Sequence, residues 1–415
     1  MAKINPFTPN SPVHRDMFAG RVKEIDAIDQ ALTQAAAGNP THILLLGERG
    51  IGKTSLLNVA DLFARGGFAW RDVEHNFLVT TLGLSGGLCL ADFALTLKNA
   101  IQRELDKAHP NAASLKRIWA FVSRFEAGGV AFRKEQSETN SALIIQEFTH
   151  SIADTIKSLK DGSLLDKVTK EGLVIIIDEA DRASDELRLG SFLKNLTEFL
   201  ARERVNNILF IVSGLPSARK ILSDDHESSL RLFREFMLKP LSAAETGEVI
   251  DRGLKESVEK LGTNLVITPE AQVLIYTYSE GYPHFVQQIG YSVFDINSDA
   301  TIDEDDVRRG VFDSGGAIEL IGNRYYVKPF YEDIKVESQR EILTIMADLK
   351  WNDWVTKADI ATRFSGKDTS LRDGLHALKE KGTIIPRDGS RGQYRLQWAS
   401  FAFWIRTHNK EAGRR

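Results

Sequence analysis

The sequence contains a single cysteine and no apolar run long enough to cross a membrane. Cys89 has no second cysteine with which to form a disulfide within the chain, which fits a reducing compartment. A transmembrane helix needs about 20 mainly apolar residues in a row, and no stretch approaches that length. The N-terminal MAKINPFTPNSPVHRDMF also lacks the apolar core of a signal peptide. We therefore expect a cytoplasmic protein with no membrane partner.

Internal repeats and low-complexity tracts are absent as well. The composition is that of an ordinary soluble globular protein, with 42% hydrophobic and 27% charged residues. A length of 415 residues exceeds what a single hydrophobic core usually serves. The sequence therefore predicts two to four domains.

The charge is unevenly distributed along the chain. The net charge is −4, yet residues 331–415 carry 16 Lys and Arg against 12 Asp and Glu. From Lys381 onward there are eight basic residues and two acidic ones. Four of the six tryptophans lie within residues 331–415. A basic end on an acidic chain indicates a polyanion or an acidic protein as partner.

A phosphate-binding pattern occupies residues 47–54, where GERGIGKT satisfies G-x-x-x-x-G-K-[ST] in full. The preceding THILLLG predicts a buried strand, and the following TSLLNVADLFARGG predicts an amphipathic helix. Glycines let successive N–H groups point at phosphate oxygens, at a helix N-terminus that favours negative charge. We expect Lys53 on the β- and γ-phosphates of ATP and Thr54 on Mg²⁺. The expected ATP-binding residues are Gly47, Glu48, Arg49, Gly50, Ile51, Gly52, Lys53, Thr54 and Ser55.

A second motif, GLVIIIDEAD, supplies the carboxylates that a nucleotide site with Mg²⁺ requires. Residues 173–177 are all apolar, which predicts a strand buried on both faces of a parallel sheet. Asp178, at the carboxyl end of this strand, is the expected partner of Mg²⁺. Glu179 is the expected catalytic residue that polarises the attacking water.

A third apolar segment, NNILFIVSGLPS, predicts another buried strand that ends at Ser213 and Gly214. Ligands bind at the carboxyl edge of such sheets, so Ser213 is a candidate to lie beside the γ-phosphate. An ordinary serine at the junction of strand and loop is the alternative.

The order of these motifs resembles that of initiator-like and STAND-type AAA+ ATPases of prokaryotes. The stretch MFAGRVKEIDAI, with Arg21, is similar to the F-x-G-R-x-x-E box that precedes the P-loop in those proteins. The resemblance implies Arg21 as a nucleotide-binding residue. It also implies an α/β fold, a P-loop NTPase parallel sheet with helices on both faces, followed by an α-helical lid and a winged helix-turn-helix.

The resemblance further implies an arginine that acts on the nucleotide of a neighbouring subunit, in a homo-oligomer. The segment SSLRLFREFMLKPLS provides Arg231 and Arg234 as candidates, before a strand FMLKPLS that leads to the lid. Surface arginines on an amphipathic helix are the alternative.

Within the lid, one helix begins with Pro283 and His284. Many AAA+ proteins have an arginine at this place. A Gly-x-Pro at this place is similar to STAND regulatory ATPases, which implies that Pro283 and His284 contact the nucleotide. Proline at the first position of an ordinary solvated helix is the alternative. The missing arginine favours a slow, regulated ATPase over a fast motor.

These patterns predict three domains: an ATPase core over residues 1–239 with a helical insertion at about 106–165, a helical lid over 240–325, and a winged helix-turn-helix over 326–415. In the lid, Ser242 with Glu245 predicts a capping box, Thr268 with Pro269 a helix start, and Asp303 a helix cap. In the last domain, three helices and a hairpin around Asp388 and Gly389 predict the winged helix.

Two outputs remain open for this winged helix. Its third helix exposes Ser370, Arg372, Asp373, His376 and Lys379, and its wing carries Arg387, Arg391 and Arg395, so residues 356–395 are expected to bind double-stranded DNA. The aromatic tail WASFAFWIRTHNK instead suits docking of a protein. The predicted function is an ATP-hydrolysing switch that controls assembly and DNA binding. The alternative is a signalling or defence-type STAND ATPase that docks an effector encoded by a neighbouring gene.

Overall fold

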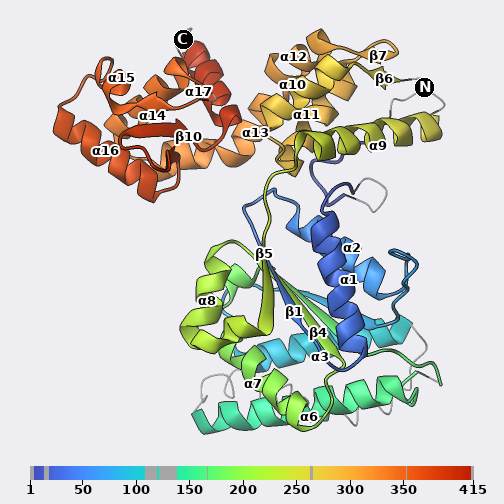
Figure 1. The fold of residues 1–415 in the computed structure, drawn as a ribbon. Helices are drawn as coiled ribbons and strands as arrows, with labels where there is room; N and C mark the ends of the chain where they lie inside the picture. The colour runs from blue at the N-terminus through green and yellow to red at the C-terminus, as the bar shows by residue number, and fades with distance from the viewer. Residues whose placement is uncertain are drawn as a thin grey trace. The chain divides into compact units, whose positions relative to one another are not determined.

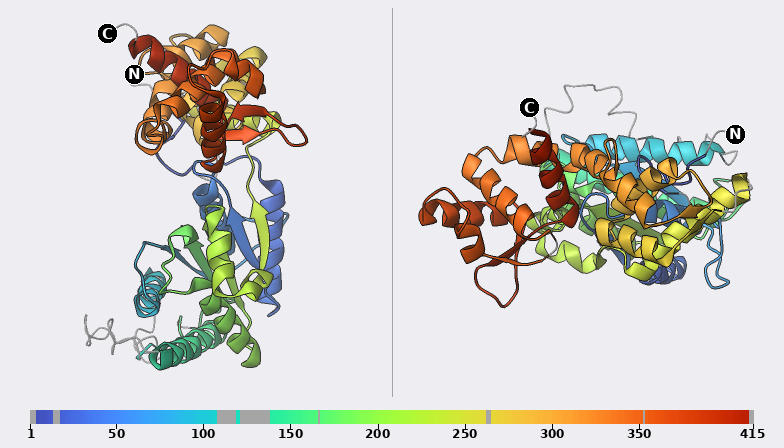
Figure 2. Two further views of the ribbon diagram at one scale, coloured as in Figure 1. Left: turned by 90° about the vertical axis from the view of Figure 1, so that its left-hand side faces the viewer. Right: turned by 90° about the horizontal axis from the view of Figure 1, so that it is seen from above.

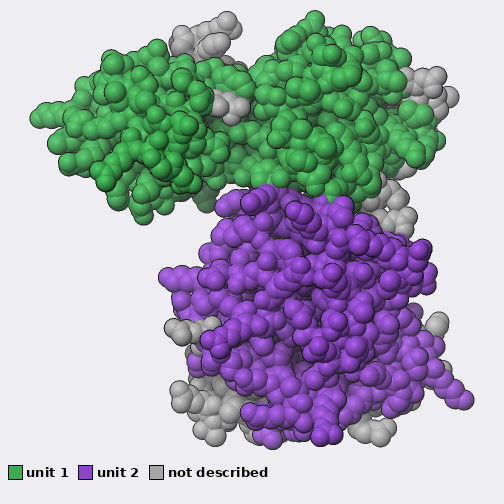
Figure 3. Space-filling model, viewed as in Figure 1, with its two compact units in different colours: residues 1–20, 240–415 green, residues 21–239 purple. Residues whose placement is uncertain are grey.

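The computed structural model describes residues 4–13, 18–107, 119–120, 138–165, 167–261, 265–351 and 353–412. The chain folds into two compact units, Arg21–Lys239 and a second unit of Met1–Gly20 with Pro240–Arg415 (Figure 3). Residues 1–20, which the sequence groups with the ATPase core, thus belong to the unit of the C-terminal residues. The division into three domains stays a prediction.

A parallel sheet with helices on both faces forms the Arg21–Lys239 unit (Figures 1 and 2). Each neighbouring pair of strands is parallel, in the order β2-β3-β4-β1-β5. The predicted α/β class is therefore confirmed. The strands described for this unit are β1 (His42–Leu46), β2 (Leu78–Gly83), β3 (Leu173–Asp178), β4 (Ile208–Gly214) and β5 (Phe233–Met237).

Both faces of the sheet are covered because its central strands carry apolar side chains on both sides. Every residue of β1 and β4 is buried, as a parallel sheet between two helical layers requires. On one face, α1 (Val22–Ala36) and α2 (Lys53–Ala64) contact the central strands. On the other face, Leu44, Ile175 and Phe210 share a core with further helices. These are α3 (Leu90–Lys107), α6 (Glu138–Lys160), α7 (Leu189–Arg202) and α8 (Ser217–Asp225).

The region predicted as an insertion contributes to this core. Phe148 and Ile152 on α6 are fully buried, and Phe148 packs edge-on against Phe192 of α7. Trp119 is 2% exposed, and its Nε1 donates to Thr155 Oγ1 at 3.1 Å. The helix α6 is therefore part of the helical layer rather than an appendage. Residues 108–118 and 121–137 of the expected insertion lie outside the described residues.

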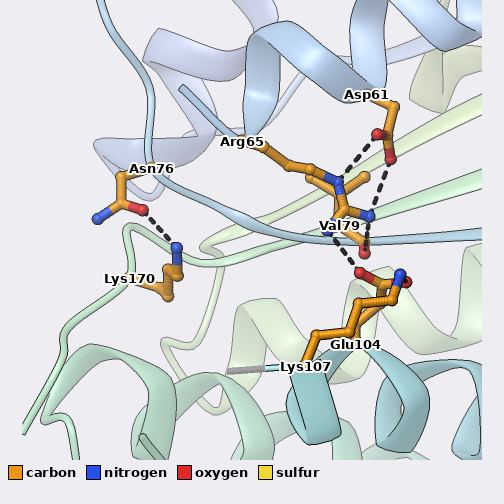
Figure 4. A network of polar contacts seen from close by, with 7 residues as sticks. All are labelled: Asp61, Arg65, Asn76, Val79, Glu104, Lys107 and Lys170. Carbon is orange, nitrogen blue, oxygen red and sulfur yellow. Dashed lines mark hydrogen bonds and ion pairs between the residues drawn. The ribbon is translucent and has the colours of Figure 1, made fainter. Parts of the chain in front are cut away.

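A polar network fixes the C-terminal end of α2, the helix that begins at the P-loop (Figure 4). The guanidinium of Arg65 donates to Asp61 on its own helix, to the carbonyl of Val79 on β2 and to Glu104 on α3. Burial alone would raise the pKa of Glu104, but hydrogen bonds from Lys107 and Arg65 lower it overall. One side chain thus joins a helix, a strand and a second helix, which holds α2 in place against the sheet.

The second unit begins with a bundle of helices whose starts follow the predicted signals. Ser242 and Glu245 form the expected capping box at α9, Thr268 caps α10 behind Pro269, and Asp303 caps α12. The N-terminal segment packs on this bundle: Phe7 is 3% exposed and lies against Gly290. The described helices are α9 (Ala243–Leu261), α10 (Pro269–Ser279), α11 (Pro283–Ile296), α12 (Glu304–Phe312) and α13 (Ala317–Tyr325).

The rest of this unit contains helices and a small antiparallel sheet in the order that the predicted winged helix-turn-helix requires. That assignment stays a prediction. Leu371, Leu375 and Leu378 of α16 are buried, while the other face of that helix is exposed. The hairpin turns at Gly389, whose φ of +72° lies in the left-handed region. The elements are α14 (Glu337–Leu349), β8 (Val355–Thr356), α15 (Lys357–Ala361), α16 (Asp368–Glu380), β9 (Ile384–Pro386) and β10 (Gln393–Leu396), with the sheet order β8-β10-β9.

The aromatic tail expected to dock a partner is instead part of the core. It forms α17 (Ala399–Ala412), on which Phe401, Trp404 and Ile405 are each at most 3% exposed. Trp404 also lies directly over Gly322 of α13, where no Cβ would fit. The prediction of an exposed docking tail is wrong, because apolar residues at helical spacing look the same whether the chain itself or a partner covers them.

None of the helices described above is long and apolar enough to cross a membrane.

Candidate functional site

The P-loop connects β1 to α2, and its backbone has the conformation that phosphate binding needs. Gly50 and Gly52 have φ values of +79° and +93°, which side chains rarely allow. The Gly47 N–H donates to the carbonyl of Gly214 at 3.2 Å, so the start of the loop is hydrogen-bonded to the end of β4. Glu48 and Arg49 are exposed, and Ile51 is buried beneath the loop. The N–H groups at the start of α2 lack helical partners and can donate to an anion.

Lys53 is the first residue of α2 and turns back over the loop. Its Nζ donates to the carbonyl oxygens of Gly47 and Glu48 at 2.7 and 3.0 Å. Burial lowers the pKa of Lys53, and the carboxylates of Asp178 and Asp181 offset part of that shift. A partly buried ammonium beside main-chain carbonyls is arranged to bind phosphate oxygens.

Thr54 and Ser213 meet at the carboxylate of Asp178, from three separate elements. Thr54 Oγ1 donates to Asp178 Oδ2 at 3.0 Å, and Ser213 Oγ donates to Asp178 Oδ1. Mg²⁺ usually takes one or two side-chain oxygens together with waters and substrate phosphates. Thr54 and Asp178 form such a pair next to the P-loop, so the residues fit Mg²⁺ bound with a nucleotide. Ser213 lies on Asp178, and its predicted contact with the γ-phosphate stays a prediction.

Glu179 follows directly on β3 in a left-handed conformation. Its φ is +57°, a strained value for a residue with a side chain, and such strain often occurs at functional sites. The Glu179 carboxylate pairs with Arg182 at 3.0 Å, and both side chains are about half exposed. The predicted role of Glu179 toward water therefore requires its side chain to leave this pair.

Two further residues lie at the site from outside the motif, Arg21 on the P-loop and Asp181 at the end of β4. Arg21, whose φ is +59°, donates from NH2 to the carbonyl of Ile51 at 3.1 Å and is 8% exposed. Asp181 accepts a hydrogen bond from the Leu215 N–H at 2.8 Å. No motif selects Asp181 in the sequence. The only signal is its place as the last letter of Asp-Glu-Ala-Asp.

The two candidate arginines lie at the β5 edge of the sheet. Arg231 is exposed at the end of η3 (Glu227–Leu232). Arg234 lies on β5 itself, so the strand begins earlier than the predicted FMLKPLS and does not follow both arginines. Arg234 NH1 donates to Gln30 Oε1 at 3.0 Å and its guanidinium lies over the Phe236 ring at 5.2 Å. The sequence does not reveal the start of this strand because β5 is an edge strand with exposed polar residues.

Pro283 and His284 open α11 in the second unit, with Pro283 at the first helical position as expected. Burial, with Arg324 beside the ring, lowers the pKa of His284 to about 4. His284 Nε2 lies 3.4 Å from Arg324 NH1. The ring is therefore neutral at pH 7, and contact of these two residues with a nucleotide stays a prediction.

Two arginines of the wing pack over the same aromatic ring. The guanidinium groups of Arg387 and Arg395 lie over the Trp354 indole at 5.7 and 5.6 Å from its centroid. Arg395 also pairs with Glu280 at 3.8 Å, whereas Arg387 and Arg391 are exposed. On α16, Asp373 pairs with its neighbour Arg372 at 3.4 Å. The wing is thus the more cationic of the two exposed surfaces.

Comparison with known protein families finds a similarity for most of the first unit. The AAA ATPase domain model matches residues 17–212. Residues 17–212 are therefore similar to an AAA ATPase domain. No curated protein matches this sequence significantly. The family match supports ATPase activity in general terms. It also supports the predicted resemblance to AAA+ P-loop ATPases.

Solved structures extend the likeness along the whole chain. The Aeropyrum pernix ORC2 protein, solved in ADPNP–ADP complexes, matches at a TM-score of 0.57 and 14% identity, over 96% of this chain and 98% of that one. CDC6P from Pyrobaculum aerophilum matches at 0.45 and 14%, over 98% of each chain. AMPPCP-bound DnaA from Aquifex aeolicus matches at 0.41 and 15%, over 99% and 98%. The likeness to ORC2 shows that the two chains share a fold. The STAND-type assignment stays a prediction.

Proposed function

We propose that the protein is an ATP-binding and ATP-hydrolysing switch whose nucleotide state controls its assembly and its DNA binding. The observation that carries this proposal is the meeting of Lys53, Thr54 and Asp178 at the carboxyl ends of β1 and β3. The fold of ORC2, whose structure holds ADPNP and ADP, supports it. A sheet edge of this kind is where α/β proteins bind ligands.

Each residue of the site has a distinct role in this proposal. Lys53 and the N–H groups of residues 47–54 would bind the phosphates, while Thr54 and Asp178 would hold Mg²⁺. When bound, Mg²⁺ neutralises charge that develops on the phosphate oxygens. Glu179 orients the attacking water and accepts its proton after its carboxylate leaves Arg182. Because α11 begins with Pro283 and His284 rather than an arginine, we infer slow, regulated turnover.

DNA is the output that we prefer for the winged helix. The exposed cations Arg387 and Arg391 on the wing are arranged to contact phosphates, which supply most of the affinity in non-specific DNA binding. The aromatic tail that favoured a protein partner is buried on α17. Docking of a protein effector is then limited to the same exposed surface, and it is the outcome expected if duplex DNA does not bind.

The nucleotide site is tested by Lys53→Ala and Glu179→Gln, titrated with ATP and Mg²⁺ in a calorimeter. Loss of the Lys53 ammonium removes charge-assisted hydrogen bonds to phosphate, so ATP should bind at least about 100-fold more weakly. Glu179→Gln should bind ATP as the wild type does and release no phosphate, because Thr54 and Asp178 are intact. Lys220→Ala, at an exposed lysine of α8, is the matched control. Wild-type ATP affinity in Lys53→Ala would refute the site.

A further inference from the structure

Asp181 connects the turn after β3 to the end of β4. Its Oδ1 accepts from the Leu215 N–H at 2.8 Å, across 34 positions of sequence. A Cβ at Gly214 would lie 3.0 Å from Asp181 Oδ1 and 3.1 Å from the Asp181 nitrogen. The carboxylate and the β4 backbone are therefore in close contact, and glycine at position 214 leaves the room for it.

The segment that Asp181 contacts leads directly to the nucleotide site on two sides. On one side, the Gly214 carbonyl accepts from the Gly47 N–H, the first amide of the P-loop, at 3.2 Å. On the other side, Ser213 donates to the Asp178 carboxylate, which also accepts from Thr54. A shift of the Gly214–Leu215 backbone would move both the P-loop and Ser213.

We propose that Asp181 is a positioning residue of the nucleotide site, which fixes the junction of β4 with the P-loop through its hydrogen bond to Leu215. This inference rests on the proposed nucleotide function and adds a residue that touches neither phosphate nor metal. The proximity of Asp181 to Lys53, whose pKa it helps to hold up, agrees with this place beside the site. Asp181 lies within the short 3-10 helix η2 (Ala180–Arg182), directly after β3 and Glu179.

The test compares Asp181→Ala with Asp181→Asn. Alanine removes the acceptor, and small misplacements of reacting groups cost large factors in rate, so kcat for ATP hydrolysis should fall about 10- to 100-fold. The ATP dissociation constant should change less than kcat. Asparagine retains an oxygen that can accept from Leu215, so Asp181→Asn should keep most of the activity. A loss in asparagine equal to that in alanine would overturn the proposal, because charge rather than the hydrogen bond would then be required.

Two controls separate positioning from a general loss of stability. Asp185→Ala changes an exposed acid on the same segment and should have no effect. In the Ser213→Ala background, Asp181→Ala should cost less than it does alone, because residues that act through one network are not additive. Full additivity of the two variants would contradict the proposal.

Amide hydrogen exchange of nucleotide-free protein gives a readout that does not depend on hydrolysis. Asp181→Ala should speed exchange at the Leu215 and Gly47 amides, and Asp181→Asn should not. Unchanged exchange at both amides refutes the proposal even in a protein that hydrolyses ATP. Failure of the wild type to bind ATP would instead refute the proposed function, and faster exchange at both amides would still support the role of Asp181 at this junction.

Discussion

Among single residues, His42 illustrates how burial selects a protonation state. It is the first residue of β1, 3% exposed, and its ring packs edge-on against Phe210. Its Nδ1 accepts from the Phe210 N–H at 3.2 Å. Burial lowers the pKa of His42 to about 4, so the folded unit holds the neutral ring at pH 7.

The sign of the resulting pH dependence follows from proton linkage. The unfolded chain takes up the His42 proton near pH 6.5 and the folded chain only near pH 4, so the unfolded state binds more protons between these values. The free energy of unfolding should therefore fall as the pH drops through this window, by about 3 kcal/mol for this residue. In urea unfolding from about pH 7 to about pH 5, His42→Gln should lose less stability on acidification than the wild type.

The substitution is chosen so that only the titrating group changes. The amide oxygen of glutamine can still accept from the Phe210 N–H, so an unpaired donor is avoided. His376→Gln, at an exposed histidine on α16, is the matched control and should keep the wild-type pH slope. Equal slopes for the wild type and His42→Gln would show that His42 does not titrate in this window.

Single residues also mark where sequence reasoning ends. Lys53, Thr54 and Asp178 could be selected because phosphate and Mg²⁺ chemistry requires those residue types at a known spacing, and the structure brings them together. Asp181 could not, because its partner is the backbone amide of Leu215, and any residue type except proline supplies that donor. A carboxylate that binds a main-chain group leaves no pattern in the sequence.

At the level of elements, continuous apolar runs correctly predicted the strands that are buried on both faces of the sheet. The uninterrupted apolar runs of β1, β3 and β4 and the polar caps of α9, α10 and α12 are local, so the sequence contains them entirely. The two edge strands, β2 and β5, are harder to predict from the sequence. On β2, Thr81 and Gly83 are exposed, and on β5 three of five residues are exposed, so neither has the continuous apolar run of a central strand. Whether a strand lies at the edge of the sheet depends on the whole fold, so the local sequence does not reveal it.

The wing is the element on which the DNA prediction depends. Removing Arg387 and Arg391 together should weaken binding to duplex DNA and lower the slope of log affinity against log salt by about one for each phosphate that the wing no longer neutralises. Removing Arg372 should have less effect, because Asp373 pairs with it and repels phosphate. Fluorescence anisotropy with labelled duplex over a salt series measures both quantities.

The matched control for the wing removes the same charge elsewhere in the unit. Arg308 and Arg309 on α12 pair with Asp305 and Asp313, so their double alanine variant should bind DNA as the wild type does. An equal loss in both double variants would point to net charge rather than to the wing. If duplex DNA shows no salt-dependent binding, a protein is the partner expected for this surface.

For the whole molecule, the question is whether one chain completes its own site. The structure describes Arg231 and Arg234 at the β5 edge of the sheet, with Arg231 exposed and Arg234 hydrogen-bonded to Gln30. Arginine suits action across an interface because it stays charged and offers a rigid fork to phosphate oxygens. In other NTPases such an arginine contributes a factor of about 10³ to 10⁵ in rate.

If either arginine acts on the nucleotide of a second subunit, turnover per subunit should rise with protein concentration as subunits assemble. The Arg231→Ala, Arg234→Ala double variant and Glu179→Gln should each be inactive alone. Mixing them should restore partial activity, because a mixed interface pairs an intact Glu179 from the first protein with intact arginines from the second. Lys220→Ala mixed with Glu179→Gln is the control for simple dilution of active sites. Phosphate release that is independent of concentration, with no gain on mixing the inactive variants, would reject action in trans and leave a switch that hydrolyses ATP as a single subunit.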